Sequence, residues 1–295
     1  MSITVDVTLP YYGDVDLMKQ AVRSVLTQTH QDWRLIVVDD GYPDPEPARW
    51  FAELTDPRVQ YLQNPINLGA NGNYRRCLEL AEAPLMLVMG ADDVMLPDHL
   101  EVAAQIVRSH PEATVIHTGV VVIDESGRLI RPLGDRLKSF YAPSGSATTT
   151  LSGEDLAVSL LRGNWTYFPS LVWRTETIRG IGFRPGLDVV QDLALLLDVA
   201  TSGGSLVFDP QVTFRYRRHT DQDSTVRALD GRRFDEEREF FAREAAGFAE
   251  RGWRRAARVS RWHLSSRLNA LSLLPRALRA TGWGAVRRLG KHVVC

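Results

Sequence analysis

The chain has 295 residues, of which 44% are hydrophobic and 24% are charged, and this is the composition of an ordinary globular protein. Its two cysteines, Cys77 and Cys295, cannot build a disulfide framework, and the lack of Cys or His at metal-ligand spacing argues against a zinc knuckle. No apolar run approaches about 18 residues and no basic, apolar leader precedes the first strand. We therefore expect a cytoplasmic protein without a membrane span.

Positive charge is concentrated at the C-terminal end of the chain. The formal net charge is −1, and residues 253–295 hold ten Arg or Lys and no Asp or Glu, which leaves −11 for residues 1–252. The sequence therefore predicts an acidic body over residues 1–252 and a basic tail over residues 253–295.

Apolar and helical patterns alternate along the first 110 residues. Strands are predicted at 3–9, 34–38, 59–62 and 85–89, and helices at 15–27 and 71–82. Strands that alternate with helices indicate a doubly wound α/β fold with a largely parallel sheet.

Carboxylates follow two of these strands, as Asp39-Asp40 and Asp92-Asp93. They could simply cap the next turn or helix. If these carboxylates gather at one edge of the sheet, they repel one another unless a cation joins them. Oxygen ligands favour magnesium or manganese, and such an ion commonly also binds the phosphates of a nucleotide. A P-loop motif and a Gly-x-Gly-x-x-Gly after the first strand are both missing, which disfavours P-loop NTPases and dinucleotide-dependent dehydrogenases.

The second half predicts a hairpin over 112–131 and a mobile flap over 134–152, which is rich in Ser, Thr, Gly and Pro. Residues 163–170 are polar and aromatic and lead into a strand at 171–174. From about residue 227 the pattern is helical, with arginines opposite Trp and Leu. Two interpretations stay open: a contact with an anionic membrane, or packing on the chain's own acidic body or on a second copy. Nucleic acid is disfavoured because no recognition motif accompanies the arginines.

Five short motifs in register resemble glycosyltransferase family 2, a large group of inverting enzymes with the GT-A fold. They are residues 10–12 (PYY), 24–29 (SVLTQT), 36–41 (IVVDDG), 64–69 (NPINLG) and 91–97 (ADDVMLP). The resemblance covers about residues 3–220. It implies a Rossmann-like, mixed-sheet GT-A domain at 1–222, with a nucleotide-sugar half at about 1–110 and an acceptor half at about 111–222. A basic, amphipathic helical region would follow at 223–295.

The resemblance also implies a nucleotide-binding set. Pro10 and Tyr12 would line the base pocket, Asp40 would bind the uracil imide with Asp39 beside it, and Asn67 with Gly69 would form the loop that approaches the nucleotide. Asp92 would contact the ribose or the metal, and Arg75 would meet the diphosphate, although Arg75 fits a solvated helix face equally well.

For the metal and the acceptor, the resemblance implies a Mn or Mg ion held by Asp93 and His219. Gly90 stands where many relatives carry a further Asp. Asn164 and Trp165 would bind the acceptor, with a core aromatic as the alternative for Trp165. Asp192 would be the general base, and Gln191 replaces the Glu that commonly precedes it; the alternative for Asp192 is a helix cap.

The sequence thus predicts transfer of a sugar from a UDP or dTDP sugar to an acceptor hydroxyl, with inversion. Polysaccharide, lipid-linked and small natural-product acceptors all stay open, as does a place on the inner face of the membrane. A nucleotidyltransferase is disfavoured because Pro10-Tyr11-Tyr12 stands where its Gly-rich loop would be. A non-catalytic nucleotide-sugar-binding or scaffold protein is the alternative, encouraged by Gly90 and Gln191.

Overall fold

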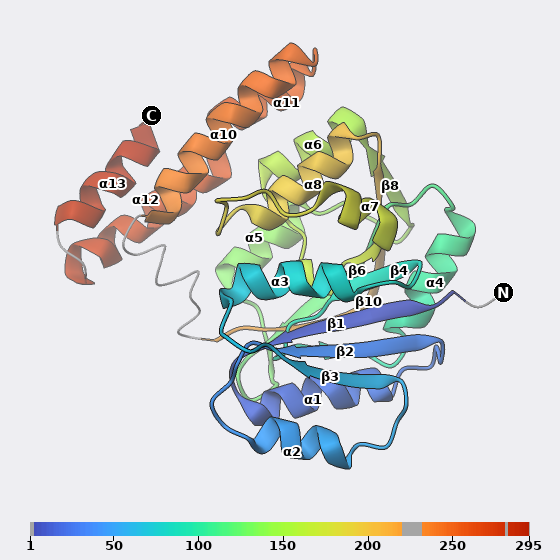
Figure 1. The fold of residues 1–295 in the computed structure, drawn as a ribbon. Helices are drawn as coiled ribbons and strands as arrows, with labels where there is room; N and C mark the ends of the chain where they lie inside the picture. The colour runs from blue at the N-terminus through green and yellow to red at the C-terminus, as the bar shows by residue number, and fades with distance from the viewer. Residues whose placement is uncertain (1–2, 220–231, 281–282, 295) are drawn as a thin grey trace.

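The computed structural model describes residues 3–219, 232–280 and 283–294. In this part of the chain, the strands form one ten-stranded sheet with helices on both faces (Figure 1). The strand order is β3-β2-β1-β4-β9-β6-β10-β5, with β7 paired to β6 and β8 paired to β10.

The first half alternates strands and helices as the sequence predicts. Its elements are β1 (Val5–Tyr11), α1 (Val15–Leu26), β2 (Trp33–Asp39), α2 (Glu46–Glu53), β3 (Val59–Gln63), α3 (Gly69–Leu80) and β4 (Leu85–Val88). Strand β1 pairs in parallel with β2 and β4, and β2 pairs in parallel with β3. The carboxyl ends of β1, β2 and β4 therefore meet at one edge of the sheet.

The second half turns the sheet into a mixed one. Strand β9 is antiparallel to both β4 and β6, while β6 is parallel to β10. The elements are β5 (Val94–Met95), α4 (His99–Ser109), β6 (Val115–Ile123), β7 (Leu129–Ile130), α5 (Leu133–Tyr141), β8 (Thr149–Ser152), α6 (Gly153–Arg162), η1 (Phe168–Ser170), β9 (Val172–Arg174), α7 (Thr175–Ile181), α8 (Gln191–Thr201) and β10 (Ser205–Arg217). This confirms the expected mixed α/β fold and the β6–β7 hairpin.

The two faces of the sheet carry separate hydrophobic cores. Side chains of α1, α2 and α4 fill the core on one face, and those of α6, α7 and α8 fill the core on the other. Strands β1, β2 and β4 are buried along most of their length, because helices cover the sheet on both sides. This burial explains their nearly continuous apolar sequence.

A buried ion pair joins β1, β2 and the loop before β4. Both oxygens of Asp6 accept hydrogen bonds from Arg34, at 2.8 and 2.7 Å. Burial acts to raise the pKa of Asp6, but the bonds from Arg34 and from the backbone N–H groups of Ala83 and Glu82 outweigh it and hold that pKa below its usual value. The pair joins two neighbouring strands, β1 and β2, to the loop that leads into β4.

The predicted mobile flap at 134–152 is wrong, because most of this segment is regular structure. It forms α5 and β8, and β8 pairs with β10. Asp135 holds α5 in place by accepting bonds from Arg218 and from the Tyr167 hydroxyl. A side chain at Gly163 would put its Cβ 2.5 Å from the Tyr141 ring, so the helix packs closely on the chain that follows α6.

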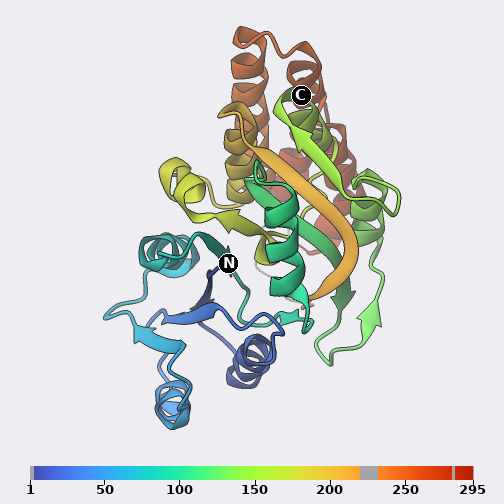
Figure 2. The same cartoon turned by 90° about the vertical axis from the view of Figure 1, so that its right-hand side faces the viewer.

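The C-terminal region forms α10 (Arg232–Glu250), α11 (Arg254–Trp262), α12 (Leu264–Ala280) and α13 (Trp283–Val294). Phe240, Phe241 and Phe248 belong to the same core as α6 and α8, and the Arg255 guanidinium pairs with Glu154 on α6. Figure 2 shows these helices beside the second half of the sheet and away from β1–β3. Packing on the chain's own body is therefore the arrangement of α10 and α11.

The predicted boundary between the GT-A domain and the C-terminal helical region, at 222–223, lies outside the described residues. None of the helices that the structure describes is long and apolar enough to cross a bilayer.

Candidate functional site

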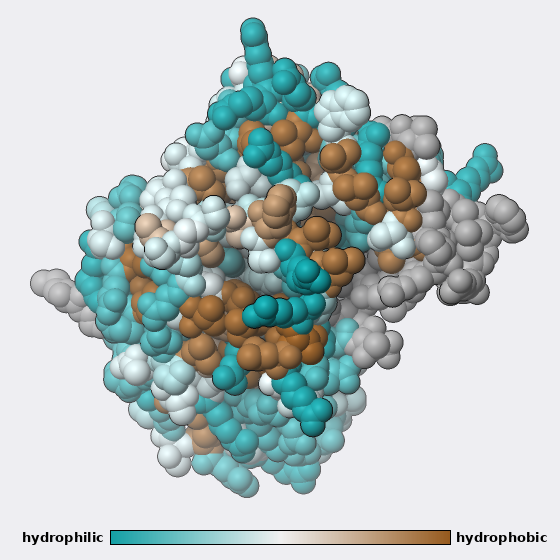
Figure 3. All heavy atoms as spheres, turned by 180° about the vertical axis from the view of Figure 1, so that it is seen from behind, coloured by the Kyte–Doolittle hydropathy of each residue, from teal (hydrophilic) through white to brown (hydrophobic). Residues whose placement is uncertain are grey.

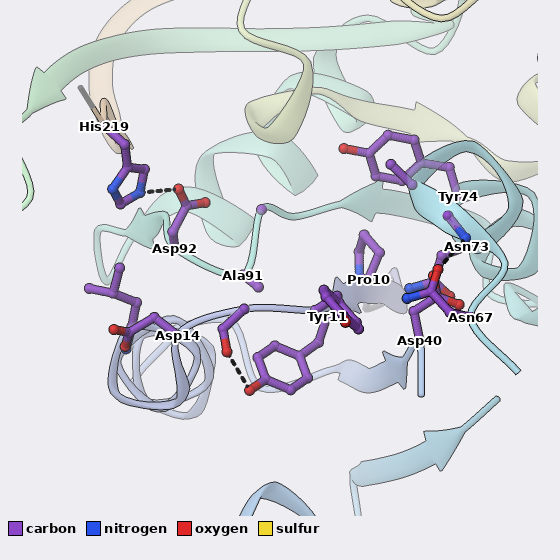
Figure 4. Close-up of a pocket in the computed structure, with 16 residues that line it drawn as sticks. Pro10, Tyr11, Asp14, Asp40, Asn67, Asn73, Tyr74, Ala91, Asp92 and His219 are labelled. Atoms are coloured by element: carbon purple, nitrogen blue, oxygen red, sulfur yellow. Dashed lines mark hydrogen bonds and ion pairs between the residues drawn. The ribbon is translucent and has the colours of Figure 1, made fainter. Parts of the chain in front are cut away.

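A cavity of about 600 Å³ opens at the carboxyl ends of β1, β2 and β4 (Figure 4). We call it the first cavity. Figure 4 shows Asp92 and His219 on one side of it and Asp40, Asn67 and Asn73 on the other. Its lining includes Pro10, Tyr12, Asp14, Asp40, Asn67, Gly69, Asn73, Tyr74, Gly90, Asp92 and His219.

Asp40 organises the side of the first cavity that follows β2. One of its carboxylate oxygens, Oδ1, accepts hydrogen bonds from Asn64 Nδ2 at 2.9 Å and from the backbone N–H of Leu68 at 2.8 Å. The Asn64 amide also donates to Asn73, whose own amide donates to the carbonyl of Val38. This buried network fixes the 64–69 loop against the sheet, so the loop is held in position before any ligand arrives.

The 64–69 loop ends at a glycine in the left-handed backbone conformation. Gly69 has a φ of 71°, a conformation that favours glycine, and its N–H donates to the Asn67 side chain at 2.9 Å. Across the cavity Tyr12 is 58% exposed and meets Tyr42 edge to face, with ring centroids 5.5 Å apart. An exposed aromatic ring that is held by a neighbour offers a surface on which a planar base could stack.

Two residues of the predicted nucleotide set lie away from the first cavity. Asp39 is fully buried, and its oxygens accept bonds from the Tyr42 N–H and the Tyr61 hydroxyl. Arg75 is exposed on α3 and does not line the cavity. Asp39 caps the turn at Tyr42, and Arg75 lies on an exposed face of α3. These are the alternatives to nucleotide binding that the sequence left open.

The carboxylates of the turn after β4 lie close to Gly90. A Cβ at Gly90 would lie 2.5 Å from Oδ2 of Asp93 and 3.0 Å from Oδ1 of Asp92. A side chain at this position would therefore require the ends of these two carboxylates to shift.

The paired carboxylates have different surroundings. Asp92 lines the first cavity, and its Oδ2 lies 2.7 Å from His219 Nε2. Asp93 is 1% exposed and does not line the cavity; its Oδ1 accepts the backbone N–H of Arg217 at 2.8 Å. Burial, and then the charge of Asp92, raise the pKa of Asp93 well above its usual value.

These residues fit a divalent cation. Oδ2 of Asp93 is buried and has no hydrogen-bond partner among the described residues, so it needs either a proton or a positive charge. Asp92 and His219 add an oxygen and a nitrogen ligand beside it. Within the described ranges no group of three or more His, Cys, Asp or Glu residues is arranged as a complete metal site. A divalent cation at this turn would have to take further ligands from outside these residues, such as phosphate oxygens.

Asp192 lies in the first turn of α8 and is held from two sides. Its Oδ1 accepts the Leu193 N–H at 2.7 Å, and its Oδ2 accepts Asn164 Nδ2 at 3.0 Å. The Asn164 oxygen in turn accepts the Thr166 hydroxyl at 2.8 Å. The amide of Asn164 is thus oriented with its N–H toward Asp192, which fixes the direction of the carboxylate.

Trp165 takes the structural role that the sequence left open. It is 1% exposed, it donates to Ser159, and its ring meets those of His117 and Phe208. It does not line the first cavity. Trp165 packs in the core, where it lines a different cavity, and its predicted contact with the acceptor stays a prediction.

Sequence reasoning missed Glu236, on α10. One oxygen of its carboxylate accepts the backbone N–H groups of Asp188, Val189 and Val190, at 3.1, 2.7 and 3.0 Å. These three residues immediately precede α8, so a carboxylate holds the positive end of the helix that carries Asp192. A lone Glu in a run of mixed charges gave no signal for this role.

Comparison with solved structures defines the fold class. S. aureus TarS aligns with a TM-score of 0.64 and 13% identity, covering 99% of this chain and 83% of TarS. The mannosyltransferase PcManGT from Pyrobaculum calidifontis, solved with GDP-Man and Mn2+, aligns with a TM-score of 0.62 and 16% identity over 100% of this chain and 80% of its own. The fold is that of the GT-A glycosyltransferases.

The sequence places the chain within that class. The model for "Glycosyl transferase family 2" matches residues 6–164, and the chain belongs to this family of glycosyltransferases. It is 27% identical to the putative glycosyltransferase EpsE of Bacillus subtilis over 42% of this chain and 45% of that protein. It is 29% identical to the putative colanic acid biosynthesis glycosyl transferase WcaA of Escherichia coli over 38% of this chain and 39% of that protein. The chain spans less than half the length of these relatives.

The hydrogen bonds to Glu236 generate a prediction about the α8 segment. In Glu236→Ala the amides of residues 188–190 should exchange with solvent at least about tenfold faster, because each hydrogen bond to a charged group contributes about 1.5–3 kcal/mol. Hydrogen exchange with mass spectrometry measures this. Glu239→Ala, an exposed position on the same helix, is the control, and equal exchange in both variants would contradict the role given to Glu236.

Proposed function

We propose that this chain transfers a sugar from a nucleoside-diphosphate sugar of the UDP or dTDP type to an acceptor hydroxyl, with inversion at the anomeric carbon. One observation carries the proposal. The first cavity gathers Asp40, the 64–69 loop, Asp92 and His219 at one sheet edge, which is where α/β sheets bind nucleotides.

The donor would lie along this edge. Tyr12 offers an exposed ring for the base, while Asp40 and the 64–69 loop provide oxygens and backbone for its polar edge. Two proteins of similar fold support a nucleotide-sugar donor, because TarS has been solved with UDP-GlcNAc and PcManGT with GDP-Man. Asp39 and Arg75, which lie away from the cavity, would contribute to nucleotide binding only indirectly.

A divalent cation, manganese or magnesium, would be held by Asp92 and His219, with Asp93 behind them and oxygens of the diphosphate as further ligands. When bound, such a cation stabilises negative charge on a departing nucleoside diphosphate. The charge of Asp92, the unpartnered oxygen of Asp93 and the nearby imidazole support this assignment.

Asp192 would act as the general base. Its carboxylate accepts the proton of the acceptor hydroxyl while that oxygen attacks the anomeric carbon from the side opposite the leaving group, and a single displacement of this kind inverts the centre. Asn164 keeps the carboxylate oriented. Gln191 has no acidic group, so Asp192 carries this step alone; Trp165 supports the segment from the core.

The acceptor and the cellular setting are further proposals. The names of WcaA and of the succinoglycan biosynthesis protein ExoO of Rhizobium meliloti, to which the chain is 24% identical over 74% of its length and 62% of that protein, support a polysaccharide as the acceptor. We extend this proposal to a lipid-linked precursor of the polysaccharide and to the cytoplasmic side of the membrane. A small natural product is the other acceptor class.

We expect Asp192→Asn to lower kcat by a factor of about 10²–10⁴, the usual contribution of a general base, while the Kd for the nucleotide stays within about threefold. Initial-rate kinetics and calorimetry on the same samples measure both quantities. Gln191→Ala is the control and should retain activity. A protein that binds the nucleotide but shows no turnover before the mutation would instead be the non-catalytic binding protein.

Calorimetry with UDP, dTDP and GDP sugars tests the donor and the metal together. We expect one uridine or thymidine sugar to bind with manganese and to bind at least about tenfold more weakly with a chelator, or in Asp92→Ala or Asp93→Ala, because the diphosphate loses its counter-charge. Asp44→Ala is the control, since this carboxylate caps α2 and does not line the cavity. Failure of every nucleotide to bind, or affinity unchanged by the chelator, would contradict the corresponding part of the proposal.

A peripheral membrane contact is proposed for α11 and α12. Trp262, Leu264, Leu268 and Leu271 are between 49% and 61% exposed, and the arginines of α11 lie beside them; the same apolar row could instead join two copies of the chain. We expect Leu264→Glu/Leu268→Glu to sediment less with anionic vesicles than wild type, because a charge on the apolar row opposes insertion. Neutral vesicles are the control, and equal sedimentation of both proteins would exclude the membrane contact.

A further inference from the structure

A second cavity, of about 800 Å³, lies between α5, the β6–β7 hairpin and β10. It shares no lining residue with the first cavity. Its size falls in the range of small-molecule sites, which are mostly apolar and carry a few placed polar groups. None of the roles proposed above uses it.

The walls of the second cavity are largely apolar. A bend in β10 shapes one wall: the register of β10 on β6 shifts on either side of Val212, and the carbonyl of Pro210 lies so close to Gly119 that a Cβ there would be 2.5 Å away. Other apolar residues of the lining are Val122, Leu129, Ile130, Trp165 and Phe208. Covering such surface with an apolar ligand removes it from water, which is favourable.

One buried polar group in this wall has no partner. His117 is 2% exposed, and burial lowers its pKa to about 3, so the ring is neutral. The backbone N–H of Tyr167 donates to Nε2 at 3.3 Å, which leaves the ring proton on Nδ1. That Nδ1 has no hydrogen-bond partner in the described part of the chain. A ligand oxygen that reached the ring would satisfy it.

Positive charge gathers at the rim. Arg131 and Arg136 line the cavity and are exposed, and neither guanidinium has an ion-pair partner among the described residues. Lys138 also lines the cavity and donates to the carbonyl of Thr166 at 2.7 Å. The carboxylate of Asp135 is already bound by Arg218. The rim therefore attracts an anion.

Helix α5 adds an exposed apolar row beside this charged rim. Leu133, Leu137 and Phe140 follow one another at helical spacing, and they are 70%, 52% and 79% exposed. On the face of the molecule turned away from the viewer in Figure 1, hydrophobic side chains gather in patches that hydrophilic ones interrupt (Figure 3). Apolar surface next to unpaired cations suits a ligand that is itself apolar at one end and anionic at the other.

We propose that the second cavity binds an anionic amphiphile, with its apolar body against the Val122, Ile130 and Phe208 walls and its carboxylate or phosphate between Arg131 and Arg136. This site is separate from sugar transfer and does not rest on it. The ligand could be a soluble amphiphile or a lipid of an anionic membrane, since both present the same chemistry.

Calorimetry of the full chain with dodecyl phosphate, below the concentration at which it forms micelles, tests the proposal. We expect saturable binding to one site, and we expect dodecanol to bind more weakly because it lacks the anion. Ser139→Trp puts a large side chain into the lining and should weaken dodecyl phosphate binding at least about tenfold. Thr150→Trp, at an exposed position of β8 outside the lining, is its control.

A second pair of variants tests the charge. Arg131→Gln/Arg136→Gln should weaken dodecyl phosphate but leave dodecanol unchanged, whereas Arg128→Gln, outside the lining, should change neither. Binding that is absent, that does not saturate, or that falls equally in the control variants would overturn the proposal. Nucleotide binding to the same samples should be unaffected by Ser139→Trp, so failure at this site is distinguishable from failure of the proposed function.

Vesicles identify the source of the ligand. Sedimentation with phosphatidylglycerol vesicles that falls in Ser139→Trp, but not in Thr150→Trp, would support a membrane lipid as the occupant. Dodecyl phosphate binding without any such change in sedimentation would support a soluble amphiphile. Both results keep the site, and they assign it to different sources.

Discussion

A buried guanidinium holds the Asp92–Asp93 side of the candidate site in place. Arg217, at the end of β10, is 2% exposed. Its side chain donates to the carbonyl of Asp92, to two carbonyls of the β6–β7 hairpin and to Gln20 on α1, while its backbone N–H donates to Asp93. A buried cation needs such partners because its desolvation is costly. The turn after β4, the hairpin and the end of β10 are therefore positioned as one unit.

The acceptor side is connected in a similar way. Lys138 donates to the carbonyl of Thr166, the Thr166 hydroxyl donates to Asn164, and Asn164 donates to Asp192. This series of contacts runs from the lining of the second cavity to the proposed general base. The two cavities are distinct, yet the segment between them, residues 164–166, has contacts in both directions. A rigid hydrogen-bonded segment of this kind orients a carboxylate more firmly than packing alone.

The sequence predicted most of the fold because its signals are local. The apolar runs of β1, β2 and β4 follow from periodicity, so these strands could be read directly. The cavity residues Asp40, Asp92 and His219 came from motif resemblance. Long-range packing decides what local pattern cannot: Asp39 and Trp165 are buried and Arg75 is exposed on α3, and none of the three lines the first cavity. The flap prediction failed because the partners of α5, such as Arg218, are distant in sequence.

The hydrogen bonds between Glu236 and residues 188–190 limit how this chain can be recombined with its relatives. The family match ends at residue 164, yet the helix with Asp192 is held by Glu236, a residue of α10. Exchanging only the matched domain, residues 6–164, between relatives would leave both Asp192 and Glu236 behind, so the transplanted nucleotide cavity would face the α8 segment of another chain. A graft of the whole candidate site therefore has to extend through α10, well beyond the segment that the family model matches.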